Sequence, residues 1–422
     1  MHQSNRKNIE LIVCKFCYKL DPDIVNSKMR FEIFKFKKMT IQIKIFQLLL
    51  LTIFILFLWR PAAAQNPCSG PGACDALLIN KGRPWDYQVS TNDSPRTLNS
   101  QTPDSKEQQV IESLNGVFNS SSIRGIALLN GDKLVHSKLK ENISEQALFY
   151  GLSVGKTVTA IAAGQAICQK LIALETKVGD VLPEFSNTDM GKASLQNLLT
   201  MSSGTWEGLR DANVATQDQF REIWSGRLTI KDLMLQPKVN SAEKDFFGKL
   251  RQPGTVFSYR NSDPEMVALM IAKVTGMSFS NWVDQSVLKA IPIAGPAVLR
   301  TDRHQNVFAS GAVQMTLNDW ARFAVWIRDA FDENSCLGSY LKDAAKPQIS
   351  TRGPNGPFTQ FKNYGYFTWV DHKMVPDSFY AHGVGGQIVA WNKRNKRMMV
   401  VFSNESPANE LAVIYREWSK LP

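Results

Sequence analysis

Residues 148–173 read LFYGLSVGKTVTAIAAGQAICQKLIA, and the architecture of the chain can be built outward from this segment. Residues 148–152 are a short strand-like stretch. Residues 157–173 are rich in Ala and apolar nearly all round, which predicts a helix buried on most of its sides. Ser153 and Lys156 stand between the two. The segment therefore predicts a strand that leads directly into a core helix, with a hydroxyl and an amine at the junction.

The flanking sequence predicts strands near both ends of the chain and helices between them. Residues 105–118 have helical spacing, and residues 123–129 and 133–139 are strand-like runs around Asn130-Gly131, a strong hairpin signal. Strand-like runs return late in the chain, over residues 364–370, 379–382, 387–391 and 398–403. A final helix follows at residues 409–420. This order predicts an α+β fold, with one antiparallel β-sheet flanked by N- and C-terminal helices and an inserted all-helical subdomain at about 157–300.

The N-terminal 64 residues have the pattern of a leader. Residues 45–59 read IFQLLLLTIFILFLW, and Ala62-Ala63-Ala64 follows. This predicts a signal peptide cleaved before Gln65, with Met39 as the true start of translation. The mature protein would be periplasmic or secreted. The alternative is an uncleaved segment 45–59 that anchors the chain to the inner membrane, which would be its one membrane contact.

After the leader, composition divides the chain once more. Residues 65–103 are rich in Pro, Gly, Ser, Asn and Asp, which predicts an extended arm, and residues 104–422 form the predicted folded domain. In an oxidising compartment Cys68 and Cys74 could close a small ring within the arm. Cys168 lies on an apolar helix face, where we expect a free buried thiol.

The net charge of +11 does not indicate a nucleic-acid partner, because residues 1–64 contribute +7 of it. The one local basic cluster, residues 393–397, lies between two strand-like runs and predicts a solvated hairpin turn. The His residues at 136, 304 and 372 have no metal-ligand spacing with other ligands, so we expect no metal and no cofactor.

The S-x-x-K of Ser153 and Lys156 can carry nucleophilic chemistry. Residues three apart share a helix face, so the lysine nitrogen can reach the serine hydroxyl. Burial disfavours the ammonium form, and the neutral amine can then accept the serine proton. Free backbone N–H groups at the helix start favour a developing oxyanion. A phosphate-binding loop ending at Gly155-Lys156-Thr157 fails on spacing, because only three residues separate Gly151 from Gly155.

Two later segments favour the Ser-Lys interpretation. Tyr259 and Asn261 form a Y-x-N on a turn-like stretch after Pro253-Gly254. Residues 382–387 read HGVGGQ, which places glycines where a strand would leave its backbone open to a ligand.

With these motifs in order, the sequence resembles the penicillin-recognising serine hydrolases over roughly residues 104–420. The relevant branch holds class C β-lactamases, DD-peptidases, family VIII esterases and 6-aminohexanoate-dimer hydrolases. Residues 198–205, LLTMSSGT, look like the family's L-L-T-x-x-S-G, and residues 311–322 also fit. The resemblance implies an antiparallel sheet with a helical subdomain and a site between them.

The resemblance also implies roles for individual residues. Ser153 would attack the carbonyl, Lys156 would accept its proton, and Tyr259 would return a proton to the leaving group. Asn261 would bind Lys156 or the substrate. The oxyanion would be held by the N–H of Ser153 and by one from the late strand, assigned to Gly385 within one place.

The third motif departs from that of β-lactamases, which carry Lys-Thr/Ser-Gly there. His382 offers a weaker, pH-dependent cation for a substrate carboxylate, or equally a structural residue at the strand edge. We therefore expect an exported hydrolase of small-molecule amides or esters. The alternatives are a β-lactamase or DD-peptidase, or a catalytically silent penicillin-binding module.

Replacement of the nucleophile tests this assignment. Ser153→Ala should abolish hydrolysis of activated esters and leave the thermal unfolding transition in place, because it deletes one oxygen without opening a core cavity. Turnover of a p-nitrophenyl ester and circular dichroism measure the two effects. Activity retained at a substantial fraction of wild type would contradict the assignment.

Overall fold

The computed structural model describes most of the chain after the leader, namely residues 85–89, 91–205, 222–223, 225–245, 247–311, 313–352, 360–405 and 407–422. The predicted signal peptide, its cleavage site and the Cys68–Cys74 pair lie outside the described residues. Within the described residues no single helix is long and apolar enough to cross a membrane. The helices over Ser262–Thr275 and Phe279–Leu288 together would be long and apolar enough, but the pair is bent by 84°.

A large sheet joins the two ends of the chain, as the strand pattern predicts. Within the described residues it has nine strands, in the order β2-β4-β3-β13-β12-β11-β10-β9-β8. All neighbours are antiparallel except the β2–β4 pair. The strands are β2 Asn99–Ser100, β3 Ile123–Asn130, β4 Lys133–Leu139, β8 Ile349–Ser350, β9 Phe361–Tyr364, β10 Trp369–His372, β11 Val375–Gly383, β12 Gln387–Asn392 and β13 Arg397–Ser403.

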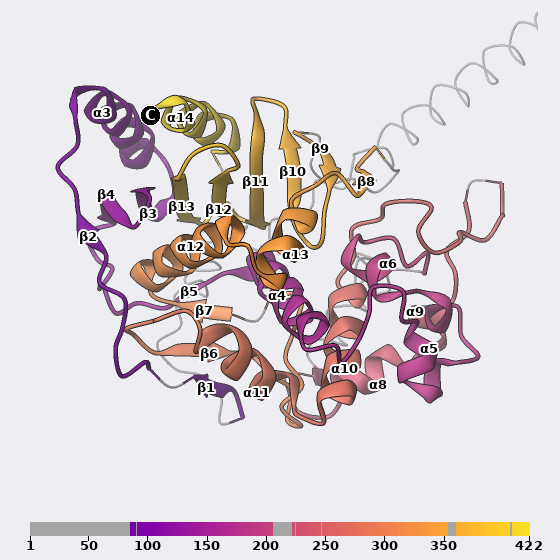
Figure 1. The fold of residues 1–422 in the computed structure, drawn as a ribbon. Coiled ribbons are helices and arrows are strands. Elements are labelled where there is room, and N and C mark those ends of the chain that lie inside the picture. Colours follow the sequence, from indigo (N-terminus) through magenta and orange to yellow (C-terminus); the bar gives the residue numbers. More distant parts are fainter. Residues whose placement is uncertain are drawn as a thin grey trace, which may run out of the picture. The chain divides into compact units, whose positions relative to one another are not determined.

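Helices cover both faces of this sheet (Figure 1). Phe379 of β11 stacks on Phe331 of α12 (Leu317–Asp332), and the next residue, Tyr380, meets Tyr415 of α14 (Ala408–Lys420). Because successive side chains of a strand point to opposite faces, α12 and α14 lie on opposite sides. Helix α3 (Ser105–Ser120), capped by Asp104, packs beside α14. The predicted flanking of the sheet by N- and C-terminal helices is confirmed.

One residue of the predicted solvated turn is buried instead. Arg397 opens β13 and is 2% exposed. Its guanidinium forms an ion pair with the buried Glu107 of α3 and lies 4.5 Å from the ring centroid of Trp418. The prediction was wrong for this residue because a strand that is buried on both faces gives its first side chain to the core. From this interior strand Arg397 therefore contacts both α3 and α14.

A second sheet was not predicted. It has four strands in the order β1-β6-β7-β5 among the described residues: β1 Tyr87–Val89, β6 Ala297–Leu299, β7 Val313–Met315 and β5 Phe149–Tyr150. The expectation of a single sheet was wrong because runs of two or three residues are too short to show a period. Residues 65–103 were predicted to form an extended arm. The C-terminal part of this arm contains β1 and β2, and each of them joins one of the two sheets.

Between β5 and β6, two strands of this second sheet, the chain is mainly helical, as expected. The segment comprises α4 Gly155–Cys168, α5 Val178–Val181, η3 Pro183–Phe185, η4 Met190–Lys192, α6 Leu195–Leu199, α8 Ile230–Met234, α9 Pro237–Asn240, α10 Ser262–Thr275, α11 Phe279–Val283 and η5 Asp284–Leu288. Helix α4 is buried on nearly all sides. It ends five residues before the predicted end, and Lys170 beyond it has a left-handed φ of 59°.

Cys168 is not a free thiol. It forms a disulfide with Cys336, the first residue of α13 (Cys336–Ala344), and thus links the end of α4 to a helix 168 residues away. No local pattern relates two cysteines at such a distance, so this pairing could not be predicted. The mixed α+β architecture predicted from the sequence is otherwise confirmed.

The disulfide predicts a measurable contribution to stability. Cys168→Ala combined with Cys336→Ala should lower the free energy of unfolding by about 2–4 kcal/mol, because the crosslink restricts the unfolded chain. Urea unfolding of the double variant and of the wild type gives the difference. A non-reducing peptide map should contain the linked Cys168 and Cys336 peptides, and alkylation of both thiols in unreduced protein would contradict the pairing.

Candidate active site

The junction between β5 and α4 presents Ser153. After Tyr150 the chain forms a short 3₁₀ turn, η2 (Leu152–Val154), which runs directly into α4. Leu152 has a φ of 47°, a conformation that costs a non-glycine residue of order 1–3 kcal/mol. Such backbone strain persists only where the surroundings fix it. The nucleophile predicted from the sequence thus sits on a tightly constrained turn.

Lys156 is the centre of the polar contacts. It is 1% exposed, and its Nζ donates to Ser153 Oγ at 2.9 Å, to Asn261 Oδ1 at 2.8 Å and to the Ser310 carbonyl at 2.7 Å. The predicted Ser153, Lys156 and Asn261 are therefore brought together, although Asn261 lies 105 residues from Lys156. The Ser310 carbonyl is a partner that no side-chain motif could reveal.

These three contacts determine what a neutral Lys156 can do. The amide and carbonyl oxygens can only accept hydrogen bonds, so they take both N–H groups of a neutral amine. The serine hydroxyl can also donate. The lone pair of the amine is then directed at the hydroxyl hydrogen of Ser153, which is the arrangement that a general base requires.

Tyr259 lies beside the same amine. Its ring centroid is 5.0 Å from Lys156 Nζ. The ring stacks on Trp369 of β10 at 5.4 Å and meets Tyr364 of β9 edge-on at 6.4 Å. Aromatic packing against the large sheet thus holds Tyr259 beside Lys156.

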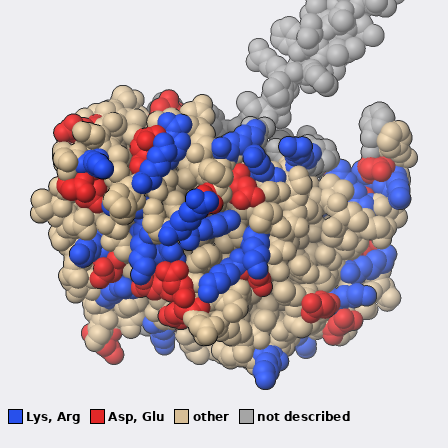
Figure 2. All heavy atoms as spheres, turned by 45° about the horizontal axis from the view of Figure 1, so that its top comes forward, with Lys and Arg blue, Asp and Glu red and all other residues tan. Residues whose placement is uncertain are grey.

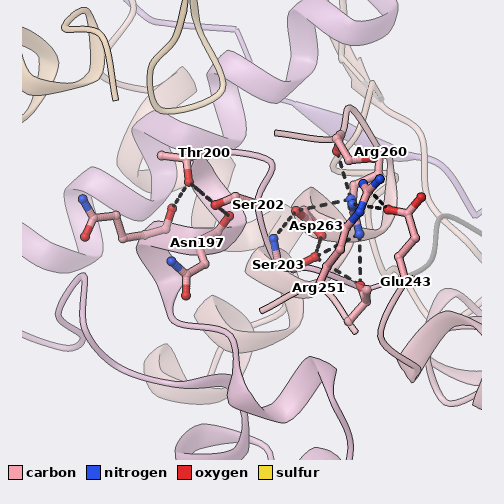
Figure 3. Close-up of polar contacts among 11 residues, drawn as sticks. Asn197, Thr200, Ser202, Ser203, Glu243, Arg251, Arg260 and Asp263 are labelled. Carbon is pink, nitrogen blue, oxygen red and sulfur yellow. Dashed lines mark hydrogen bonds and ion pairs between the residues drawn. The ribbon is translucent and has the colours of Figure 1, made fainter. Parts of the chain in front are cut away.

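A buried charge network fixes the backbone around Tyr259 (Figure 3). The Ser203 hydroxyl donates to Asp263 Oδ1 at 2.6 Å. Arg260 Nε lies 3.9 Å from Asp263 Oδ2, and Arg260 Nη2 lies 3.7 Å from Glu243 Oε2. Burial raises the pKa of Asp263 to about 6, against the opposing effects of Arg260 and Ser203. The arginine between Tyr259 and Asn261 is therefore anchored away from the nucleophile.

The L-L-T-x-x-S-G segment supports the same loop. The carbonyls of Met201 and Ser202 accept hydrogen bonds from the N–H groups of Ser258 and Gly254. In the turn, Thr200 and Ser202 share a hydrogen bond at 2.8 Å (Figure 3). This segment thus holds the loop that carries Tyr259.

A second buried carboxylate, Glu265, was missed by the sequence analysis. It lies on α10, is 3% exposed, and accepts hydrogen bonds from the N–H groups of Ala309 and Ser310. Burial raises its pKa to about 7. The signal that could have revealed it is a second acidic residue, two positions after Asp263, directly before the apolar run of residues 266–272.

The structure does not bring the His382 side chain into the site. The ring lies 6.2 Å from Phe361 and lines a small cavity with Tyr380 and Leu411, on the face that α14 covers. Burial lowers its pKa to about 4. Of the two expectations for His382, the pH-dependent cation for substrate is wrong, because the pleat of β11 turns residue 382 away from Ser153.

Gly383, rather than Gly385, approaches the nucleophile. A Cβ on Gly383 would lie 2.7 Å from the Gly151 carbonyl and 3.2 Å from Ser153 N. Gly385 has a φ of 80° in the β11–β12 turn, and a Cβ there would meet Gln387, Ser403 and Asn404. The backbone of this segment that approaches Ser153 is therefore at Gly383, and the second oxyanion donor, assigned to Gly385 within one place, stays a prediction.

Among the residues that the structure describes, no group of three or more His, Cys, Asp or Glu side chains is placed to hold a metal ion. On the face shown in Figure 2, Lys and Arg lie interspersed with Asp and Glu, as on an ordinary solvated surface.

Comparisons with known proteins place this geometry in context. The sequence profile of the family described as Beta-lactamase matches residues 108–418. No curated protein matches the sequence. Many solved structures share the fold. A Bacillus anthracis protein, provisionally described as a 6-aminohexanoate-dimer hydrolase, is 21% identical with a TM-score of 0.62, and the match covers 82% of this chain and 90% of that one.

Two further structures share the fold. A β-lactamase/D-alanine carboxypeptidase from Pseudomonas syringae is 16% identical with a TM-score of 0.56, over 76% of this chain and 100% of that one. A hydrolase with promiscuous acyltransferase activity is 14% identical with a TM-score of 0.58, over 74% and 98%. At these identities the likeness shows the fold alone.

The close approach of Gly383 generates a prediction. Gly383→Ala should lower kcat for an activated ester about a hundredfold, because the new methyl group must displace the backbone at Gly151 and Ser153. Gly116→Ala in α3 is the matched control: a Cβ there meets nothing within 4 Å, so activity should be unchanged. A kcat for Gly383→Ala within threefold of wild type would show that β11 does not need this approach.

Proposed function

The chain belongs to the beta-lactamase family, and from that premise we propose that it is an exported serine hydrolase that cleaves small-molecule esters or amides through an acyl-enzyme on Ser153. The observation that carries the proposal is the set of three contacts made by Lys156 Nζ, to Ser153, Asn261 and the Ser310 carbonyl. They orient a buried amine toward a serine hydroxyl.

The contacts support a two-step reaction. In the first step Ser153 Oγ bonds to the carbonyl carbon while its proton passes to Lys156 Nζ. Collapse of the tetrahedral intermediate breaks the bond to the leaving group, which takes a proton through Lys156 or Tyr259. In the second step a water molecule gives a proton to the same groups and attacks the acyl carbon. The bond to Ser153 Oγ then breaks as that proton passes to Oγ, which releases the acid and free Ser153.

Backbone groups supply the oxyanion site in this proposal. The N–H of Ser153 lies at the start of η2, where helical N–H groups have no partner within the helix. The second donor comes from the backbone just after Gly383, the part of β11 nearest Ser153. Donors fixed before the reaction stabilise the developing charge without reorganisation.

The end of β11 favours uncharged esters and amides over β-lactams. Residues 381–386 read AHGVGG and contain no Lys, Arg, Ser or Thr. The one ionisable side chain, His382, lies on the opposite face of the sheet and has a lowered pKa. A β-lactam carboxylate would therefore find neither a cation nor a hydroxyl on this strand. The similar fold of a provisional 6-aminohexanoate-dimer hydrolase agrees with an amide substrate.

Export is supported by two independent features. The leader has the composition of a signal peptide, and Cys168 and Cys336 form a disulfide. Disulfides persist in oxidising compartments such as the periplasm or the extracellular space. Determination of the mature N-terminus, expected at Gln65, distinguishes a secreted protein from one anchored through residues 45–59.

Covalent labelling tests the proposed nucleophile. A fluorophosphonate probe should form an adduct on Ser153, identified by peptide mapping, and Lys156→Ala should react nearly as slowly as Ser153→Ala, because the two residues work as a unit. Absence of an adduct in the wild-type protein would favour the catalytically silent penicillin-binding module instead.

A substrate panel tests the proposed specificity. The p-nitrophenyl ester or the 6-aminohexanoate dimer should have a kcat/KM about ten- to a hundredfold above that of nitrocefin, because one charge-assisted contact to the β-lactam carboxylate is worth about 1.5–3 kcal/mol. The three are compared under identical conditions. Nitrocefin as the best substrate would return the protein to the β-lactamase class.

A further inference from the structure

The peptide that binds Lys156 is itself held by a buried acid. Glu265 Oε2 accepts the Ala309 N–H at 2.9 Å and Oε1 accepts the Ser310 N–H at 3.1 Å. On the other side of the same residue, the Ser310 carbonyl accepts Lys156 Nζ at 2.7 Å. One backbone residue therefore connects a carboxylate on α10 to the amine on α4.

Two more contacts fix this segment, residues 309–311. The Thr159 hydroxyl of α4 donates to the Ala309 carbonyl at 2.8 Å. Gly311 packs so closely that a Cβ there would lie 2.9 Å from the carbonyl carbon and oxygen of Leu152, the residue before the nucleophile. A displacement of the segment would thus reach both Lys156 and Ser153.

The contacts require a carboxylate at position 265. Two successive N–H groups point at it, and only an ionised acid accepts with both oxygens and donates nothing. Glutamine would turn an NH₂ group toward one of the two amides. Burial disfavours the charged form of Glu265 and raises its pKa to about 7. The carboxylate therefore lowers the stability of the fold, and its contact with the Ser310 peptide explains why it is present.

We propose that Glu265 is a positioning residue for the Ser153–Lys156 pair: it fixes the Ser310 peptide, whose carbonyl directs the lone pair of Lys156 toward the serine hydroxyl. The inference rests on the proposed function, and deepens it by adding a residue that never touches substrate. Glu265 acts through Ser310 and Lys156, as a hydrogen-bonded outer layer does at many reactive sites.

The test is the rate at which Ser153 reacts with a fluorophosphonate, because this readout needs no knowledge of the substrate. In Glu265→Gln the second-order rate constant should fall about ten- to a hundredfold, the range expected when a reacting group is displaced by about 1 Å. For a turned-over ester the loss should appear in kcat, with KM unchanged within about twofold. A rate constant within twofold of wild type in folded variant protein would overturn the proposal.

Asp319→Asn is the matched control. Asp319 is also fully buried and accepts two successive backbone N–H groups, from Ala294 and Gly295, at 2.8 and 2.9 Å. It lies at the start of α12, and the structure shows no contact between it and Lys156 or residues 309–311. Its replacement should lower the melting temperature and leave the labelling rate unchanged. An equal loss in both variants would mean that Glu265 is merely structural.

The pH profile separates orientation from stability. The groups that face Glu265 are Lys156 of α4, whose field lowers the carboxyl pKa, and Ser310 with the N–H of Ala309, which also lower it. As pH falls through about 7 the carboxylate gains a proton and one oxygen becomes a donor, so the wild-type labelling rate should fall there. Glu265→Gln should lack this step, and persistence of the step in the variant would contradict the role.

Two outcomes need a second measurement. If wild-type Ser153 is not labelled at all, the proposed function fails, and crystal structures decide the positioning role alone: an unmoved Ser310–Lys156 contact in Glu265→Gln overturns it, and a broken contact supports it. If Glu265→Gln does not fold, Thr159→Val loosens the same segment from the other side and should slow labelling about three- to tenfold. An unchanged rate in that variant overturns the proposal.

Discussion

The burial of Lys156 is the constraint on which the rest of the site depends. An amine that is 1% exposed must find a partner for every N–H, because an unsatisfied buried donor is costly. It finds three oxygens, on η2, at the start of α10 and in the turn before β7. Each of these elements is therefore held in register with the others. The same three contacts orient the amine toward Ser153.

Two buried acids in the first turn of α10 hold two of the segments that surround the site. Asp263 binds the Ser203 hydroxyl and thereby the segment that braces Tyr259, and Glu265 binds the backbone that faces Lys156. Burial raises the pKa of both. Each therefore binds more protons when folded than when unfolded between about pH 4 and 7, so its contribution to stability is lost as pH rises through that range. These two carboxylates thus order the site at a cost to the stability of the fold.

The large sheet contributes a third segment to the site, the end of β11, and the pleat of this strand decides which residues face Ser153. Gly383 lies against Ser153, while its neighbour His382 faces the helix on the opposite side. A glycine is required at this point because any side chain would meet the Gly151 carbonyl. The alternation of side chains along β11 explains why His382, although it precedes Gly383 in the sequence, lies outside the site.

The sequence by itself determined the elements whose residues are close along the chain. The S-x-x-K lies within one helical turn, the Y-x-N within one loop, and the long strands and helices show their periods. The α+β fold could therefore be predicted, and so could the grouping of Ser153, Lys156, Tyr259 and Asn261 in space. Only the tertiary structure decided the second sheet, the Cys168–Cys336 disulfide, the face on which His382 lies and the part played by Glu265 and the Ser310 carbonyl. These depend on contacts between residues far apart in the chain, on strands too short to show a period, and on backbone groups that every residue carries. A local pattern contains no information about any of the three.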